Sequence, residues 1–220
     1  SRGLGDVYKR QIFGCLREND LFKNTWIIFT ADHGEMLGDH HMSQKNLFFE
    51  GSAHVPLLIM PPQGRSLPQN ISVEAPTDLV DLYPTILAMA GLSSPVSVSG
   101  RNLLEPVPMD RIFFGNSLNR NFCVMEEKVK LVYSAVGDHV LLFDLNTDPM
   151  EQHNLAEDPA WQERKAKLWK LLLEHTAQYT PEALDEKGQF LTYEAPHFPG
   201  DVPGRWFGFH YHDYSVDTFH

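Results

Sequence analysis

The stretch WIIFTADHG, residues 26–34, decides how this chain folds. Residues 26–31 are apolar, β-branched or aromatic, and the run ends abruptly at Asp32, His33 and Gly34. A short, continuous apolar run of this kind predicts a strand buried on both faces, as in a parallel sheet. Ligands of open α/β sheets bind just beyond the carboxyl ends of such strands. The sequence therefore places a carboxylate and an imidazole where a ligand would bind.

Two interpretations of this strand end stand side by side. Asp32 offers a hard oxygen and His33 an imidazole nitrogen, and a divalent cation can use both as ligands. Alternatively, Asp32 caps a following helix and His33 is a hydrogen-bonded polar residue at the rim of the sheet. Taken alone, the dipeptide favours the second interpretation, because so short a motif often matches by chance.

The residues around this dipeptide favour the metal-ligand interpretation. The segments IIFTADHGEMLGDH (27–40), KNLFFE (45–50) and HVPLLI (54–59) occur in this order within about thirty residues. Together they resemble the sulfatase family of the alkaline-phosphatase superfamily. This resemblance implies that Asp32 and His33 are ligands of an active-site divalent cation, usually calcium. It also implies that Lys45 contacts the sulfate group of the substrate.

A histidine-containing loop follows the strand. The Gly-Asp-His step that ends at His40 is similar to one that sulfatases often carry, so His40 is a candidate substrate-binding residue, with its neighbour His41 as an alternative. A role in positioning the loop is equally compatible with the resemblance.

Neither cysteine matches the nucleophile of the family. Sulfatases use a Cys within Cys-x-Pro-Ser-Arg, oxidised to formylglycine, whereas Cys15 and Cys123 stand in other contexts. Both are therefore expected to be packing residues, and no catalytic residue is assigned in this chain. We expect the nucleophile segment in a missing N-terminal portion. Residues 1–11 lack an initial Met, resemble translated adaptor read-through, and are left out of the fold prediction.

The composition and net charge of the chain argue against some classes of binding partner. Of the 220 residues, 42% are hydrophobic. The chain has 18 Lys and Arg residues and 29 Asp and Glu residues, which gives a net charge of −11. This acidity argues against non-specific binding of nucleic acid, although a bound cation and Lys45 would supply a local site for an anionic ester. No apolar run is long enough to span a membrane. The resemblance suggests a periplasmic, secreted or lysosomal protein, but the sequence itself does not fix the compartment.

The second half of the chain predicts a helix and then a small sheet. A helix is expected over residues 77–90, with Thr77 as its cap, a bend or a restart at Pro84 and an end at Gly91. Short strands are expected at 111–115, 122–133 and 139–143. Because tight turns join them, these strands predict an antiparallel sheet.

The segment DLNTDPMEQHNL, residues 144–155, carries a second resemblance to sulfatases, at the end of their small C-terminal sheet. Its Asn, Asp and Pro residues predict chain reversal and no catalytic role. A helix from Glu157 to about Gln178 follows, with an apolar stripe read as a packing face. The tail, 181–220, matches no pattern. Its polar residues His210, His212 and Asp213 suggest a second metal site, but packing of its aromatic rings is the preferred interpretation.

The sequence thus predicts an α/β fold. It is expected to be the C-terminal part of an alkaline-phosphatase-like α/β sandwich, residues 12–108, joined to an antiparallel-sheet subdomain with a packed helix, residues 109–180, and the tail. The predicted function is that of a sulfatase fragment. The whole enzyme would hydrolyse the sulfate ester of a carbohydrate or an aryl compound with a divalent cation, most simply Ca²⁺, and this fragment alone would be inactive. A phosphonate monoester or phosphodiester hydrolase, and a non-catalytic relative, are the alternatives.

Overall fold

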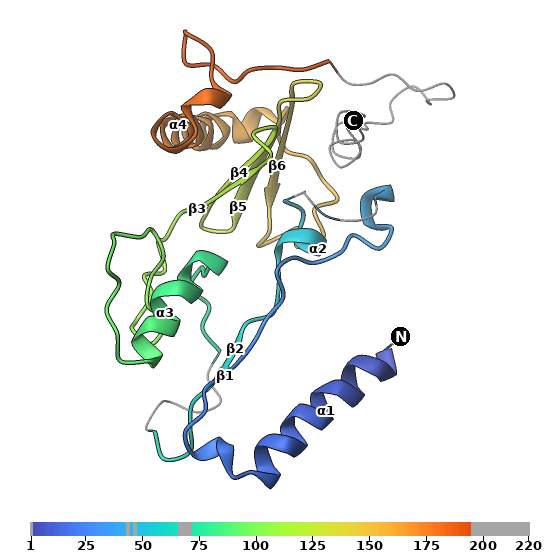
Figure 1. Cartoon of the computed structure of the whole chain (residues 1–220). Helices are drawn as coiled ribbons and strands as arrows, with labels where there is room; N and C mark the ends of the chain where they lie inside the picture. Colours follow the sequence, from blue (N-terminus) through green and yellow to red (C-terminus); the bar gives the residue numbers. More distant parts are fainter. Residues whose placement is uncertain (1, 43–44, 46–47, 66–71, 195–220) are drawn as a thin grey trace, which may run out of the picture.

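The computed structural model describes residues 2–42, 45, 48–65 and 72–194. A long N-terminal helix lies at one end of the molecule and a two-stranded ribbon leads from it to a four-stranded sheet covered by a second long helix (Figure 1). The helices are α1 (Arg2–Glu18), α2 (Glu50–Ala53), α3 (Leu82–Met89) and α4 (Gln162–Tyr179). The strands are β1 (Ile27–Phe29), β2 (Leu58–Met60), β3 (Phe113–Ser117), β4 (Asn121–Glu126), β5 (Val129–Ser134) and β6 (His139–Asp144).

The predicted antiparallel sheet is confirmed, with one strand more than expected. Strands β3 to β6 lie in sequence order, and each pairs antiparallel with the next. Residues 122–133, predicted as one strand, form β4 and β5. A two-residue turn at Glu127 and Lys128 separates them, with φ values of 52° and 63°. Such primed hairpin turns are usually signalled by Asn or Gly, and neither residue occurs here.

The C-terminal sheet has a hydrophobic core on each of its faces. Successive side chains of a strand point to opposite faces, so each strand contributes to both cores. Alternate side chains of β4 and β5, such as Val124 and Leu131, form a core with Leu168 and Leu172 of α4. This confirms the apolar stripe of α4 as a packing face. Within this core, the ring of Tyr133 meets Trp169 edge to face, with centroids 4.9 Å apart.

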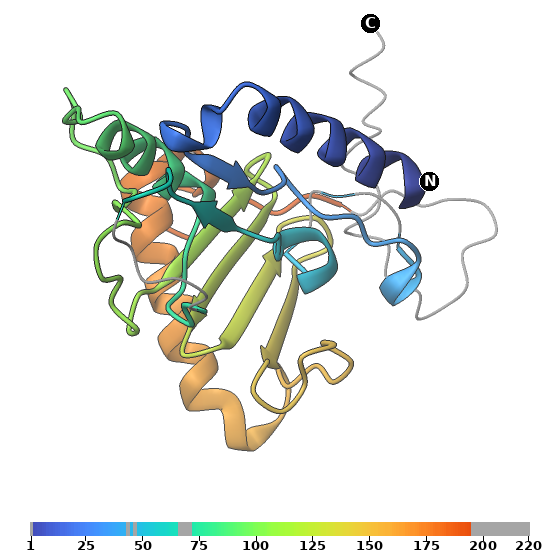
Figure 2. The same cartoon turned by 90° about the horizontal axis from the view of Figure 1, so that it is seen from below.

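The opposite face of the sheet packs against the segment that follows Asp32 and His33. Here Cys123, Val132 and Phe143 form a second core with three buried residues of the N-terminal half: Met36, Met42 and Phe49. Figure 2 shows α4 and α2 on opposite sides of the sheet. The C-terminal sheet is therefore the support against which the predicted site loop is held.

The first strand differs from the prediction. Strand β1 pairs antiparallel with β2, with Ile28 opposite Ile59, rather than lying in a parallel sheet. It is also not buried on both faces, since Phe29 is 44% exposed and its partner Leu58 is 59% exposed. The physical reason is that, within the described part of the chain, β1 and β2 form a ribbon of two strands without a third strand beside it.

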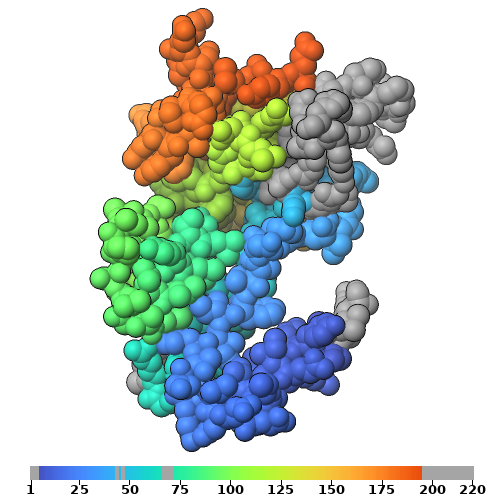
Figure 3. All heavy atoms as spheres, viewed as in Figure 1, coloured from blue at the N-terminus to red at the C-terminus, as the bar shows by residue number. Residues whose placement is uncertain are grey.

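The N-terminal helix includes residues that the sequence analysis set aside. Helix α1 runs without a break from Arg2 to Glu18 and lies at the edge of the molecule in the space-filling view of Figure 3. Phe13 faces Phe22 at 6.0 Å between ring centroids, and the Lys9 ammonium lies 5.4 Å from the ring of Phe29. Within the described ranges, no helix has both the length and the apolar character needed to cross a bilayer.

The predicted helix at 77–90 is present, but it is capped differently. Asp78, not Thr77, closes a capping box with Asp81, so a short 3-10 turn (Leu79–Asp81) precedes α3. The α-helix starts at Leu82, directly after the 3-10 turn, so Pro84 lies in the first turn of α3, where a backbone N–H has no helical partner. This agrees with the expected restart of the helix at Pro84. Gly91 ends the helix with φ of 72°, as predicted.

One buried carboxylate fixes the start of α3 to the segment that leads into β3. The side chain of Asp81 is fully buried and accepts two hydrogen bonds from the Arg111 guanidinium, at 2.5 and 2.9 Å. The backbone amides of Asp78 and Arg101 also donate to it, each at 2.8 Å. Burial alone would raise the pKa of Asp81, but these donors together hold it below its ordinary value.

Replacing Asp81 with Ala should therefore destabilise the chain strongly at neutral pH. Breaking a buried pair leaves the Arg111 charge without compensation, which costs about 3–5 kcal/mol. Urea unfolding at pH 7 measures this loss. Because the folded-state pKa of Asp81 is depressed, its contribution is complete above about pH 4 and disappears as the pH falls through the folded-state value.

Glu174→Ala provides the matched control. Glu174 forms an exposed pair with Lys170 at 3.8 Å, and such a pair contributes at most about 1 kcal/mol. A difference between the wild type and Asp81→Ala that stayed constant from neutral to strongly acidic pH would contradict this role for the carboxylate.

Candidate functional site

The candidate site begins three residues beyond the end of β1. Asp32 bends back on its neighbour, and its Oδ1 accepts a hydrogen bond of 3.0 Å from the backbone amide of His33. Its other oxygen, Oδ2, lies 3.5 Å from Nε2 of the His33 ring. The carboxylate is 87% exposed. No helix begins directly after Asp32, so the capping interpretation is wrong; the next helical turn is Asp39–His41.

The hydrogen bond on the other side of the His33 ring fixes which nitrogen can act as a ligand. Nδ1 lies 2.7 Å from the carbonyl oxygen of Gly34. A carbonyl oxygen can only accept, so Nδ1 must carry the proton. In the neutral ring, Nε2 is then the unprotonated nitrogen, and it lies 3.5 Å from Asp32 Oδ2. A backbone carbonyl bound to one ring nitrogen is the usual way in which proteins orient a metal-ligating histidine.

This pair fits part of a divalent-cation site. It joins an imidazole nitrogen to a carboxylate oxygen, a donor set compatible with several divalent cations. Two donors do not complete a coordination shell. Among the residues that the structure describes, no group of three or more His, Cys, Asp or Glu side chains is arranged to hold a metal ion. The predicted polar residues of the tail lie outside those residues.

Gly34 belongs to the motif for a steric reason. A Cβ atom at this position would lie 2.1 Å from the carbonyl oxygen of Gly51, so only glycine allows the two backbones to approach. Two hydrogen bonds hold them together: Gly34 N donates to Ser52 O at 2.7 Å, and Glu35 N donates to Gly51 O at 2.9 Å. The loop that carries His33 is therefore fastened to α2.

The other predicted site residues are placed less directly. Lys45 is exposed, and the residues on either side of it, 43–44 and 46–47, lie outside the described part of the chain. The half-buried ring of His40 stacks on Phe49 at 4.3 Å between centroids, and its backbone is left-handed, with φ of 52°. This contact is the kind expected of a loop-positioning residue.

A buried charge cluster behind the loop was not predicted from the sequence. Lys130 of β5 projects from the same face of the sheet as Val132, and its side chain is 3% exposed. Its ammonium lies 2.6 Å from Oε1 of Glu50 and 2.7 Å from Oε1 of Glu151. It also donates to the carbonyl oxygen of Phe48 at 2.7 Å. We call Lys130, Glu50 and Glu151 the buried triad.

Further contacts of Glu50 add to the ion pairs of the triad. The backbone amide of Glu50 donates to Oε2 of Glu151 at 2.7 Å, and His54 Nδ1 lies 2.7 Å from Oε2 of Glu50. Burial alone would lower the pKa of Lys130, but the side chains of Glu151 and Glu50 beside it raise it above its ordinary value. Lys130 is thus a cation at neutral pH. Burial would raise the pKa of Glu50, yet Lys130 and His54 hold it lower.

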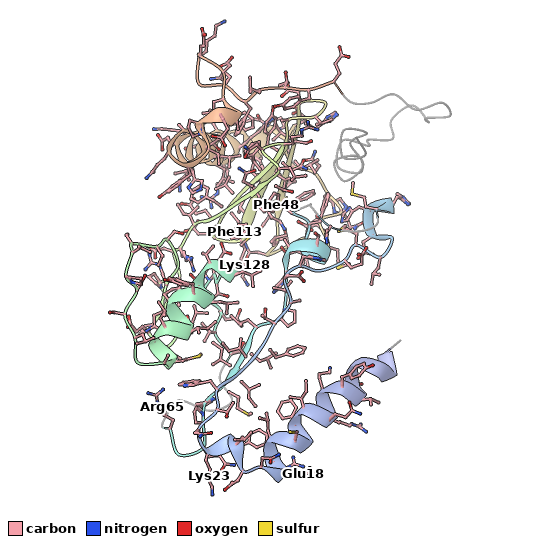
Figure 4. The ribbon with its side chains drawn as sticks, viewed as in Figure 1. Glu18, Lys23, Phe48, Arg65, Phe113 and Lys128 are labelled. Carbon is pink, nitrogen blue, oxygen red and sulfur yellow. The ribbon has the colours of Figure 1, made fainter. Side chains whose placement is uncertain are left out.

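An aromatic contact closes the same junction. Phe48 and Phe113 lie where the segment before α2 meets the sheet (Figure 4), and both pack against the second core. A Cβ atom at Gly115 would come within 2.3 Å of the Phe48 ring. Gly115 therefore provides the space that this ring occupies.

The second sequence motif explains how Glu151 reaches the triad. Asp148 accepts from the backbone amides of Gln152 and His153, at 3.1 and 2.8 Å. Asn154 Oδ1 accepts from the amides of Leu142 and Ala156, at 2.9 and 3.0 Å. Turn chemistry is confirmed for these side chains. Glu151 was not singled out by sequence reasoning, and its burial at φ of 56° is the part that was missed.

The two cysteines differ in their surroundings. Cys123 is fully buried, and burial raises its pKa to about 12, as suits a packing residue. Cys15 is exposed on α1, so the expectation that it packs is wrong.

The structure is that of an α/β domain with a carboxylate and an imidazole just beyond the end of a strand. Residues 9–92 match the Sulfatase family model. The chain belongs to the sulfatase family.

Named relatives agree with this assignment. The chain is 33% identical over 166 residues to arylsulfatase K of Xenopus laevis, covering 66% of this chain and 30% of that protein. It is similar to the phosphonate monoester hydrolase of Agrobacterium radiobacter, with 31% identity and a TM-score of 0.62 over 81% of this chain and 41% of that one. A protein solved with its substrate D-glucosamine-2-N,6-O-disulfate shares the fold, at 23% identity and a TM-score of 0.62 over 80% of this chain and 39% of that one. The chain thus spans about a third of the length of the curated relatives that it matches.

Substituting Gly34 with Ala should displace the loop from α2. The added methyl group meets a backbone carbonyl that cannot rotate away, so we expect a loss of about 1–3 kcal/mol in the free energy of unfolding, measured by urea denaturation. Gly14→Ala is the control, since a Cβ there has nothing within 4 Å. Because Gly14 lies within α1, that change should stabilise by about 0.5–1 kcal/mol. Equal stability of the two variants would show that Gly34 has no steric role.

Proposed function

We propose that this chain forms one side of the active site of a divalent-cation-dependent sulfate ester hydrolase, within a longer protein. The observation that carries the proposal is the Asp32–His33 pair, in which Oδ2 and a lone-pair-bearing Nε2 lie 3.5 Å apart at a strand end. The pair lies within the region that matches the family model. Membership of the family supports the reaction class, and the pair supports the use of a cation.

In this proposal, the protein residues bind and orient. Asp32 and His33 would hold a divalent cation, for which we propose Ca²⁺, and the bound cation would polarise the oxygens of the ester. Lys45 would orient the anionic group of the substrate through its exposed positive charge. The carbonyl of Gly34 keeps the proton on Nδ1 of His33, which leaves Nε2 available to the cation.

The nucleophile is proposed to come from outside this chain. Neither Cys15, which is exposed, nor Cys123, which is buried in the core, stands in a Cys-x-Pro-Ser-Arg context. The matched relatives are much longer than this chain. We therefore expect a formylglycine in the N-terminal part of the longer protein, and we expect the 220-residue chain alone to be inactive.

The substrate is proposed to be a sulfated carbohydrate or an aryl sulfate. Relatives named as sulfatases support the sulfate ester, and one structural neighbour holds a disulfated glucosamine. The second candidate function is hydrolysis of a phosphonate monoester, favoured by a similarity of 31% to an enzyme of that name. A relative without catalytic activity is the third, and it would keep the fold without turnover.

An assay of the longer protein separates these possibilities. The coding sequence upstream of this segment is first determined, and the extended protein is then tested with an aryl sulfate and an aryl phosphonate monoester. We expect the sulfate ester to be the better substrate, and Lys45→Ala to lower its kcat/KM by about 100-fold. Lys187→Ala, a substitution of an exposed lysine far along the chain, should change nothing.

Other outcomes would redirect the assignment. Faster turnover of the phosphonate ester would move the protein to the second function. An extended protein without turnover of either ester, or turnover by the 220-residue chain alone that is lost on Asp32→Ala, would contradict the proposal.

A further inference from the structure

The buried triad lies behind the candidate site without touching it. Each contact of Lys130 in the triad leads either to the segment around α2, through Glu50 and the carbonyl of Phe48, or to Glu151 beyond β6. Two links join Glu50 to Glu151. Lys130 contacts both carboxylates, and the backbone amide of Glu50 donates a hydrogen bond to Glu151. The start of α2 is therefore fixed at both its backbone and its side chain.

The same short segment holds the loop of the candidate site. The carbonyls of Gly51 and Ser52 accept the amides of Glu35 and Gly34. The Gly34 residue is then fixed on both sides, because its own carbonyl accepts from Nδ1 of His33. A displacement of α2 would move Gly34, and with it the ring of His33, because two backbone hydrogen bonds join the loop to α2.

We propose that Lys130 is a positioning residue for the Asp32–His33 pair, acting through Glu50, α2 and Gly34. This inference rests on the proposed function, since it assumes that the pair binds a cation. The C-terminal sheet would then contribute to the site by setting the orientation of His33 from behind. Groups that orient a metal ligand typically change metal affinity by about 10–100-fold when they are removed.

The burial of charge in this place supports a positioning role. A buried ion pair adds little stability over apolar residues of the same shape, because both charges lose their hydration. Directed hydrogen bonds, however, define one geometry. The ammonium group of Lys130 donates to the carbonyl oxygen of Phe48 and to Oε1 of Glu50, and it forms an ion pair with Glu151 at 2.7 Å. An apolar side chain would fill the space without fixing the register of α2 against the sheet.

The test compares local and overall opening of the 220-residue chain. Amide hydrogen exchange is measured in the wild type, in Lys130→Met and in Lys167→Met, in which an exposed lysine paired with Glu126 is replaced. Loss of a hydrogen bond to a charged group predicts about tenfold or more faster exchange at the amides of Gly34 and Glu35 in Lys130→Met. The amides of Leu155 and Tyr193, which bond within the C-terminal part, should exchange at wild-type rates in all three proteins.

Glu50→Gln covers the case in which Lys130→Met opens the whole chain. This change keeps the shape of the side chain and removes one charge of the triad, so the same two site amides should exchange faster while the two control amides do not. Unchanged exchange at Gly34 and Glu35 would overturn the inference. Equal acceleration at all four amides in both variants would also overturn it, since the triad would then stabilise the fold without positioning the loop.

Calcium and manganese titrations of the same variants of the extended protein, which is expected to supply the remaining ligands, separate this inference from the proposed function. We expect the affinity of the wild type for Mn²⁺ to fall about tenfold or more in Lys130→Met and to stay constant in Lys167→Met. A wild type that binds neither ion contradicts the proposed cation site in this chain, whereas the exchange rates still decide whether Lys130 positions the loop.

Discussion

The contacts of one buried lysine organise the relation between the two halves of this chain. Lys130 is nearly inaccessible to solvent, yet it is a cation that reaches two carboxylates and a backbone carbonyl. A charge can remain in such a place only if hydrogen bonds replace the water that it has lost. The acceptors come from segments about eighty residues before it and about twenty after it, so the charge joins parts of the chain that local structure cannot join.

The packing around this lysine follows from a simple alternation. Successive residues of β5 point to opposite faces of the sheet, so Leu131 faces α4 while Lys130 and Val132 face the site loop. A sheet covered on both faces can support a helix on one side and a functional loop on the other. The same alternation places Cys123 against the loop, where burial raises the pKa of its thiol. The small C-terminal sheet is thus a support for the loop as well as a subdomain core.

Much of this arrangement could be predicted from the sequence, and the failures have identifiable causes. The end of β1, the antiparallel sheet, the apolar face of α4 and the Gly91 helix end follow from local patterns, which tertiary contacts here do not override. The turn at Glu127 and Lys128 was missed because these residues adopt positive φ without the usual Asn or Gly. The burial of β1 was overestimated, since an apolar run shows which side chains prefer to be buried and does not show how many strands cover them.

In the candidate site, too, some residues could be predicted from the sequence and others could not. Asp32 and His33 could be singled out because they are adjacent in sequence and follow a strand. The triad could not, since Lys130 and Glu151 look like ordinary strand and turn residues until their partners at Phe48 and Glu50 are known. Pairing over such separations depends on the whole fold.

The central claim is that His33 presents Nε2 to a cation beside Asp32, and NMR of the imidazole nitrogens tests it most directly. A long-range ¹H–¹⁵N spectrum of the ¹⁵N-labelled chain, with His33→Gln used for assignment, reports which ring nitrogen carries the proton before and during titration with Ca²⁺. The account predicts a protonated Nδ1 throughout and a change in the Nε2 resonance as the ion binds. A proton on Nε2, or an Nε2 resonance that does not respond to the ion, would contradict it.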